Sequence, residues 1–225
     1  MALILNIDTA TETAQIGISE NGNVLAFESN EDQMTHGAFV QPAIERILRA
    51  SSMTLSAIDV VAVSAGPGSY TGLRVGMASA KGICFALQKP LILINTLDIL
   101  STASKRQSPD QSADVFFCPM IDARRMEVYT ALYDRNLSSV LAPVAMILDE
   151  TSFSAYLSSH KIIFSGSGSA KFFKILHHPN AIFNPVTHAP ADLASLSSRF
   201  YHEKRFADLA YSQPFYLKEF YTPKS

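Results

Sequence analysis

The sequence predicts a mixed α/β protein of two lobes, and three features of the 225-residue chain carry this prediction. The first is an order of short β-branched strands and amphipathic helices over residues 1–104. The second is a buried strand that ends in a glycine turn and continues as a helix, over residues 60–87. The third is the recurrence of strand, glycine turn and helix at residues 161–176, which indicates a second, abbreviated lobe.

The first lobe, expected over residues 1–104, begins with a meander of three short strands joined by polar turns. An amphipathic helix follows at residues 35–51, with Pro42 expected either in its first turn or at a kink. After the central strand and its helix at residues 70–87, a further strand and a short helix that Thr96 could cap complete the lobe. The remaining strands and helix are predicted at residues 3–7, 13–19, 24–28, 91–94 and 96–104.

The second lobe, expected over residues 105–225, follows a polar linker at residues 101–114 that contains Pro109. It is predicted to hold three further strands, a helix, the second strand–glycine–helix unit and a C-terminal helix before an aromatic tail. The aromatic residues of that tail could pack on the second lobe or dock on a partner, and for Phe215 and Tyr216 we favour packing on the second lobe. The ranges predicted for these elements are residues 115–121, 127–133, 140–144, 151–158, 161–165, 169–176 and 191–206.

The order of elements in the first lobe is three antiparallel strands followed by helix, strand, helix and strand. This order is the half-unit of the actin, Hsp70 and sugar-kinase (ASKHA) superfold. We therefore predict a two-lobed ASKHA-like fold with an abbreviated second lobe. Folds of this kind host many chemistries, so the analogy alone assigns no activity.

The turn after the central strand has two interpretations. Gly66 and Gly68 can adopt positive φ and Ser69 can cap the next helix, which favours binding of an anion such as a phosphate, although neither the P-loop nor the dinucleotide fingerprint is present. A stripe of small residues on the same helix instead favours close packing of another helix, because a glycine inside a helix costs about 0.5–1 kcal/mol and needs a packing reason. The stripe comprises Gly72, Gly76 and Ala80. The two interpretations are compatible.

Composition narrows the classes of function. Charged residues make up 17% of the chain, against about 25% in typical soluble domains, which favours a partner-facing surface. The net charge of −2 argues against a domain that grips nucleic acid by itself, so any RNA contact would be shared with a partner. Cys84 and Cys118 fit neither a disulfide framework nor a metal site and are expected to be reduced core thiols. Without an export signal or a stretch of about 20 apolar residues, the protein is expected to be soluble and cytoplasmic, with no membrane partner.

Four segments carry the most distinctive residue patterns. They are Leu5-Asn-Ile-Asp-Thr-Ala-Thr-Glu12, Gly66-Pro-Gly-Ser-Tyr-Thr-Gly-Leu-Arg-Val-Gly76, Ile121-Asp-Ala-Arg-Arg-Met-Glu-Val-Tyr129 and Pro214-Phe-Tyr-Leu-Lys218. In this order they resemble the motifs of the TsaB (YeaZ) family, whereas residues 135–210 match it weakly. The resemblance implies a part in installing N6-threonylcarbamoyladenosine beside the tRNA anticodon, at position 37 of tRNAs that read ANN codons.

The resemblance further implies a non-catalytic subunit that pairs with its catalytic paralogue TsaD and is joined by the ATPase TsaE. ATP and metal would belong to those partners, and tRNA would be met through the complex. A homodimer would use the same surface when TsaD is absent. We expect that surface on the helices at residues 35–51 and 70–87, and its predicted residues are His36, Phe39, Val40, Ala43, Ile47, Tyr70, Leu73, Gly76, Met77 and Ala80.

The catalytic relatives implied by the resemblance hold a metal through two histidines spaced i, i+4 on the first-lobe helix. His36 stands at the first position but Val40 at the second, so we expect neither a metal site nor catalytic residues. Asp8 ends a strand where kinases of this superfold meet phosphate or its metal, or else it caps its own turn. The residues retained as a nucleotide-binding candidate are Asp8, Thr9, Gly66, Gly68, Ser69, Gly166 and Gly168.

The turn at Asp122, Arg124 and Arg125 is the most charged feature of the second lobe. It is interpreted either as a solvated hairpin turn that Asp122 initiates or as an ion-pairing site toward the other lobe or a partner.

Two further classes of function stay open. One is an active enzyme, either an ATP-dependent small-molecule kinase or a metallopeptidase of the same superfold. The other is a free-standing nucleotide-binding regulator. A kinase would bind ATP with magnesium alone, a peptidase would retain metal through dialysis, and a regulator would bind ligand as a monomer without TsaD.

Overall fold

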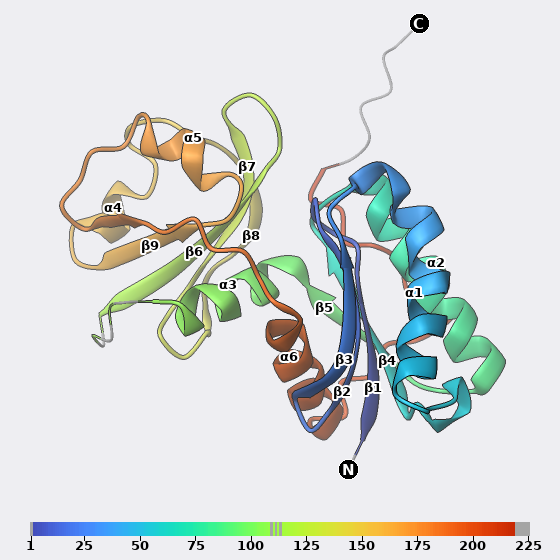
Figure 1. Cartoon of the computed structure of the whole chain (residues 1–225). Coiled ribbons are helices and arrows are strands. Elements are labelled where there is room, and N and C mark those ends of the chain that lie inside the picture. The colour runs from blue at the N-terminus through green and yellow to red at the C-terminus, as the bar shows by residue number, and fades with distance from the viewer. Residues whose placement is uncertain (1, 109, 111, 113, 219–225) are drawn as a thin grey trace, which may run out of the picture. The chain divides into compact units, whose positions relative to one another are not determined.

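A computed structural model of the chain describes residues 2–108, 110, 112 and 114–218. The chain divides into two compact units, one formed by Met1–Ile99 with Ala189–Phe215 and the other by Leu100–His188 with Tyr216–Ser225. Each unit contains a five-stranded sheet of parallel and antiparallel pairs (Figure 1). The predicted α/β class is confirmed.

The sheet of the first unit has the strand order β3-β2-β1-β4-β5. The first three strands form the predicted antiparallel meander, β4 pairs parallel to β1, and β5 pairs parallel to β4. All seven residues of β4 are buried, because helices cover both faces of the sheet at its centre. The strands are β1 (Leu3–Asp8), β2 (Ala14–Glu20), β3 (Asn23–Asn30), β4 (Val60–Gly66) and β5 (Leu91–Asn95), which confirms the predicted ranges to within two residues.

Helices α1 (His36–Ala50) and α2 (Tyr70–Leu87) cover one face of this sheet (Figure 1). Pro42 lies inside α1 on its exposed side, rather than in the first turn. Ser69 caps α2 as predicted, since its Oγ accepts a hydrogen bond of 3.3 Å from the Gly72 N–H. At the start of α3 (Thr96–Arg106) the cap is instead the preceding residue, Asn95, whose Oδ1 accepts from Leu97 N–H at 2.8 Å. Two short 3₁₀ helices, η1 (Gln33–Thr35) and η2 (Leu55–Ala57), complete this part.

Helix α6 (Pro190–His202) covers the other face of the first sheet. The sequence placed this segment in a lobe of residues 105–225, whereas the structure packs Leu193, Leu196 and Phe200 on the apolar face formed by β1, β4 and β5. The physical reason is that α1 and α2 cover only one face of a sheet whose central strands are apolar on both. The first unit is therefore discontinuous in sequence.

The segment after α6 also stays with the first unit. Ala207 forms an isolated bridge with Leu91, and Phe215 N–H donates to the carbonyl of Ala65 at 2.6 Å. The expectation that Phe215 packs on the second lobe is therefore wrong. The pairing of β4 with β5 shifts between Ser64 and Gly66, and the Ala65 carbonyl at this shift accepts from the returning chain. Phe220 and Tyr221 of the aromatic tail lie outside the described residues.

The sheet of the second unit has the order β10-β9-β6-β7-β8. Its core centres on a cluster of aromatic rings from Phe153, Phe164, Phe172 and Phe183. The helices are shorter than predicted, and β10, only three residues long, was not predicted. Because α3 continues to Arg106, the polar linker begins later than expected, and its Pro109 lies outside the described residues. The elements are β6 (Val115–Asp122), β7 (Glu127–Tyr133), β8 (Ser139–Ile147), α4 (Ser154–Leu157), β9 (Lys161–Ser165), α5 (Ser169–Phe173) and β10 (Ala181–Phe183).

The small-residue stripe of α2 packs inside the first unit. A Cβ at Gly72 would overlap the carbonyl oxygen of Thr9, and a Cβ at Gly76 would overlap the Thr9 hydroxyl and contact Ile7 and Val63. Ala80, further along the same stripe, is fully buried. The prediction that this stripe faces a partner is therefore wrong: the glycines allow α2 to approach its own sheet.

We predict that Gly72→Ala lowers the free energy of unfolding by about 1–3 kcal/mol or more, because the methyl group has no space beside Thr9. The matched control is Gly82→Ala on the same helix, where a Cβ would meet nothing within 4 Å. That control should raise the free energy of unfolding by about 0.5–1 kcal/mol through helix propensity. Equilibrium urea unfolding measures both, and equal effects of the two substitutions would contradict the packing described here.

Candidate functional site

The candidate phosphate site of the first unit lies where β1 and β4 end and α2 begins. Gly66 has a φ of +106°, the left-handed conformation that glycine tolerates, whereas Gly68 does not adopt positive φ. The loop after β1 lies directly against this turn: Ser69 N–H donates to the carbonyl of Ala10 at 2.7 Å, and Thr9 Oγ donates to the carbonyl of Gly72 at 2.7 Å. Two polar groups of the turn are thus already bonded within the unit.

Asp8 is fully buried at the end of β1. Its Oδ1 accepts a hydrogen bond of 3.0 Å from Ala10 N–H, two residues further on. This is the turn-capping geometry that short polar side chains provide, and it holds the loop that closes over α2. Asp8 therefore supports the local fold, and a nucleotide contact of Asp8 and Thr9 stays a prediction.

The second glycine turn, Gly166-Ser167-Gly168, packs against β6. Gly166 has a φ of +83°, and a Cβ there would lie 2.5 Å from the carbonyl oxygen of Met120. Gly168 N–H donates to that same carbonyl at 2.9 Å. The helix that follows, α5, has five residues. The geometry thus explains both glycines by close backbone packing, and their contact with a nucleotide also stays a prediction.

His36, the candidate for the first metal-ligand position, is 2% exposed. Its Nε2 lies 3.2 Å from the carbonyl oxygen of Glu12, and Val40 one turn later is fully buried in the core. Within the described ranges, no three His, Cys, Asp or Glu side chains are grouped so that they could hold a metal ion. Cys84 and Cys118 are free and buried as predicted, and burial raises their pKa values to about 11 and about 12.

The residues predicted as a partner surface lie mostly on the inner sides of α1 and α2. Only Phe39 and Tyr70 keep partial exposure. The others are buried in the first unit, namely His36, Val40, Ala43, Ile47, Leu73, Gly76, Met77 and Ala80. Hydrophobic periodicity identifies the apolar face of a helix, and on α1 and α2 that face packs against their own sheet rather than against a partner.

The outer side of α2 was missed by sequence reasoning. Its exposed residues include Ala78, Gly82 and Phe85, with Val75 half-buried among them, and the Phe85 side chain is 80% exposed. Gly37, at the exposed start of α1, lies beside Val75, since a Cβ there would be 3.9 Å from Val75 Cγ2. Like the small-residue stripe of Gly72, Gly76 and Ala80, the residues of the outer side of α2 recur every three or four positions, but they lie on the opposite side of the helix.

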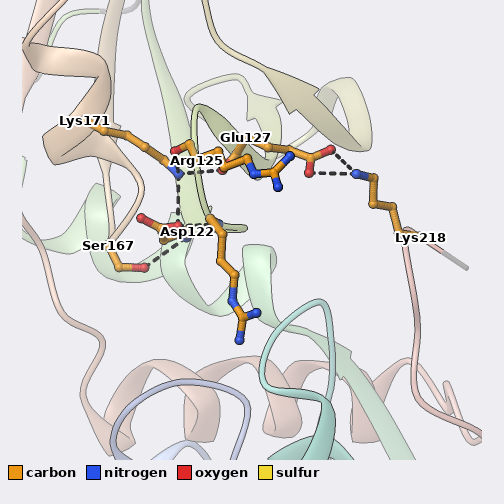
Figure 2. Close-up of polar contacts among 7 residues, drawn as sticks. Asp122, Arg125, Glu127, Ser167, Lys171 and Lys218 are labelled. Atoms are coloured by element: carbon orange, nitrogen blue, oxygen red, sulfur yellow. Dashed lines mark hydrogen bonds and ion pairs between the residues drawn. The ribbon is translucent and has the colours of Figure 1, made fainter. Parts of the chain in front are cut away.

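The charged turn between β6 and β7 is organised by a lysine that sequence reasoning did not single out. Lys171 on α5 donates from Nζ to Asp122 Oδ1 at 2.9 Å and to the carbonyl oxygens of Arg125 and Glu127 at 2.9 and 2.6 Å (Figure 2). Its side chain is only 14% exposed, so three acceptors satisfy its three N–H groups away from bulk water.

Three further contacts complete this hairpin network. Asp122 Oδ1 also accepts from Arg124 N–H at 2.6 Å. The Asp122 N–H donates to the Ser167 Oγ at 3.2 Å (Figure 2). Lys218 pairs with the carboxylate of Glu127 at 2.7 Å. Partial burial acts to raise the pKa of Asp122, but the hydrogen bonds from Lys171 and Arg124 outweigh it and hold that pKa below its usual value. The interpretation of Asp122 as initiator of the turn is confirmed.

Comparison with known proteins assigns the chain to a family. Residues 30–216 match the family model described as TsaD: tRNA N6-adenosine threonylcarbamoyltransferase. The chain belongs to this family, on its TsaB (YeaZ) branch. It is 32% identical over 130 residues to the tRNA threonylcarbamoyladenosine biosynthesis protein TsaB of Bacillus subtilis, and 33% identical over 138 residues to TsaB of Escherichia coli. These matches cover 58% and 61% of the chain, and span 54% and 57% of the two relatives.

Solved structures agree over almost the whole length. YeaZ from Pseudomonas aeruginosa is 26% identical, with a TM-score of 0.80 over 96% of this chain and 100% of that one. A candidate N-acetylmannosamine kinase from Listeria monocytogenes, 11% identical, has a TM-score of 0.51 over 90% of this chain and 99% of its own, which extends the likeness to sugar-kinase folds. The predicted ASKHA superfold is confirmed. None of the described helices combines the length and the apolar composition required to cross a membrane.

We predict that Lys171→Met lowers the free energy of unfolding by about 1–3 kcal/mol, because the Asp122 carboxylate and two carbonyl oxygens lose their shared donor. Lys174→Met, an exposed lysine on the same segment, should change stability by less than about 0.5 kcal/mol. Urea unfolding at neutral pH measures both variants.

The same variant has an expected pH dependence. A carboxyl whose pKa is lowered in the folded state adds stability that is present above its unfolded pKa of about 4 and is lost as pH falls through the folded value. The stability difference between wild type and Lys171→Met should therefore narrow below about pH 4. A difference that stays constant down to pH 2 would show that Asp122 is not the group Lys171 stabilises.

Proposed function

We propose that the chain is a subunit of the complex that transfers a threonylcarbamoyl group to N6 of the adenosine at position 37 of tRNAs reading ANN codons. The observation that carries this proposal is the family match over residues 30–216, supported by relatives named for threonylcarbamoyladenosine biosynthesis. In this proposal the catalytic paralogue TsaD pairs with the chain, the ATPase TsaE joins the pair, and tRNA is met through the complex. We place this activity in the cytoplasm.

We further propose that the chain contributes no catalytic residue. The support is that the position four residues after His36 is Val40, a side chain that cannot bind a metal and that is fully buried in the core. His36 itself is buried beside the carbonyl of Glu12, so its ring is not presented to a substrate. ATP and metal would then be held by the partner subunits.

The outer sides of α1 and α2 are the surface we assign to TsaD. Gly82 has no neighbouring atom within 4 Å of an added Cβ, and Ala78 is exposed one turn before it on α2. Gly37 and Ala38 are exposed at the start of α1, where Gly37 lies beside Val75 of α2, so a partner helix could approach closely along this side. Phe85, 80% exposed at the end of this row, offers an apolar side chain that association would bury. A homodimer would use the same surface when TsaD is absent, because related subunits can replace one another about a two-fold axis.

We predict that Gly82→Leu blocks association with TsaD while the chain stays folded, since the added side chain projects into open space. Co-expression with the cognate TsaD followed by size-exclusion chromatography measures the loss of the complex, and circular dichroism measures folding. Gly82→Ala, a much smaller addition, is the matched control and should retain more of the complex. If Gly82→Leu still co-elutes with TsaD, the interface lies elsewhere; if wild type does not co-elute, the pairing itself is excluded.

We predict that, with unmodified tRNA and an activated threonylcarbamoyl donor supplied, neither the chain alone nor TsaD alone transfers the threonylcarbamoyl group, and that the two together with TsaE do. Mass spectrometry of digested tRNA measures the modification.

In the same preparations, the isolated chain should retain no stoichiometric metal after dialysis. Tight binding of ATP with magnesium by the isolated chain would favour the kinase alternative, and retained metal would favour the metallopeptidase.

A further inference from the structure

The β6–β7 hairpin holds two adjacent arginines in an unusual backbone conformation. Arg124 and Arg125 have φ values of 71° and 48°, the left-handed region that costs a non-glycine residue about 1–2 kcal/mol. Lys171 and Asp122 hold this conformation through the main chain, by bonds to the Arg125 carbonyl and from the Arg124 N–H. The backbone that carries both guanidinium groups is therefore fixed by contacts that leave those groups unused.

The charges around the hairpin balance in a way that leaves the two arginines uncompensated. Of the two carboxylates on the hairpin, Asp122 is paired with Lys171 and Glu127 with Lys218. Arg124 and Arg125 are both exposed, and within the described residues neither guanidinium has a hydrogen bond or an ion pair. The two lysines thus neutralise the acids that would otherwise pair with the arginines, and a local charge of +2 faces solvent on a chain whose net charge is −2.

We propose that Arg124 and Arg125 bind the phosphate backbone of the RNA that the complex modifies, which makes this turn the RNA contact of the second unit. This inference rests on the proposed function. The guanidinium fork matches phosphate oxygens in bidentate geometry, and a fixed turn loses little conformational freedom when it binds. A phosphodiester strand also presents successive anions, so adjacent arginines can each engage one. Such contacts position RNA without reading its sequence.

The test is the affinity of unmodified tRNA that reads an ANN codon for the purified complex with TsaD, measured by fluorescence anisotropy over a range of salt concentrations. We expect Arg124→Gln/Arg125→Gln to weaken binding about tenfold or more at low salt and to reduce the slope of log K against log salt by about 1–2. Each glutamine keeps a polar side chain but removes the positive charge and the guanidinium fork that would bind phosphate.

The matched control is Arg199→Gln/Lys204→Gln, which removes two exposed positive charges from the first unit, one in the last turn of α6 and one just after that helix ends. It should leave the affinity within about twofold of wild type and the slope unchanged. Co-elution of each variant with TsaD is measured on the same samples. Because the main-chain bonds of the turn do not involve the arginine side chains, the double variant is expected to fold and assemble.

The outcomes separate this inference from the proposed function. Equal effects of the two double variants, or an unchanged salt slope in Arg124→Gln/Arg125→Gln, overturn the RNA contact while leaving the proposed function intact. Loss of TsaD from the Arg124→Gln/Arg125→Gln sample shows that the pair meets an acidic protein surface and likewise overturns it. A wild-type complex that binds no tRNA overturns both.

Discussion

The contact between the loop after β1 and the first turns of α2 is the constraint on which the first unit depends. Thr9 lies so close to Gly72 and Gly76 that neither position accepts a side chain, and its hydroxyl bonds to the helix backbone. This contact sets the rotation of α2 about its axis. Because the inner stripe is fixed against the sheet, the residues on the opposite side, including Gly82 and Phe85, are fixed facing outward.

The second unit depends on a polar constraint instead. A single lysine, buried among three oxygen acceptors, ties a five-residue helix to a hairpin whose backbone is strained. Hydrogen bonds to a charged group contribute about 1.5–3 kcal/mol, which is of the same order as the cost of two left-handed residues. The hairpin can therefore keep an arginine pair at a position where glycine or asparagine would ordinarily be expected.

The sequence was sufficient for elements whose residues carry a local signal. The five strands of the first sheet, the Ser69 cap and the free buried cysteines follow from β-branched runs, capping chemistry and spacing. It was insufficient where the answer depended on distant residues. The glycines of α2 face the sheet because they pack against Thr9, which is more than 60 residues earlier in the sequence. Helix α6 joins the first unit because it covers an apolar sheet face formed by strands far earlier in the chain. Lys171 carries no signal of its own, since its role depends on two carbonyl oxygens 44 and 46 residues earlier.

The discontinuity of the first unit has a consequence for the way the chain matures on the ribosome. Residues 1–99 emerge first, yet the face of their sheet that bears Ile4, Val60 and Ile92 has no cover until α6 has been synthesised, about ninety residues later. Throughout that interval the nascent chain carries an open apolar sheet face, while residues Leu100–His188, the larger segment of the second unit, are made and can collapse locally. The earlier-made strands of the first unit thus wait for a late helix before their core can close, and nascent-chain chaperones can act on the open face during that interval.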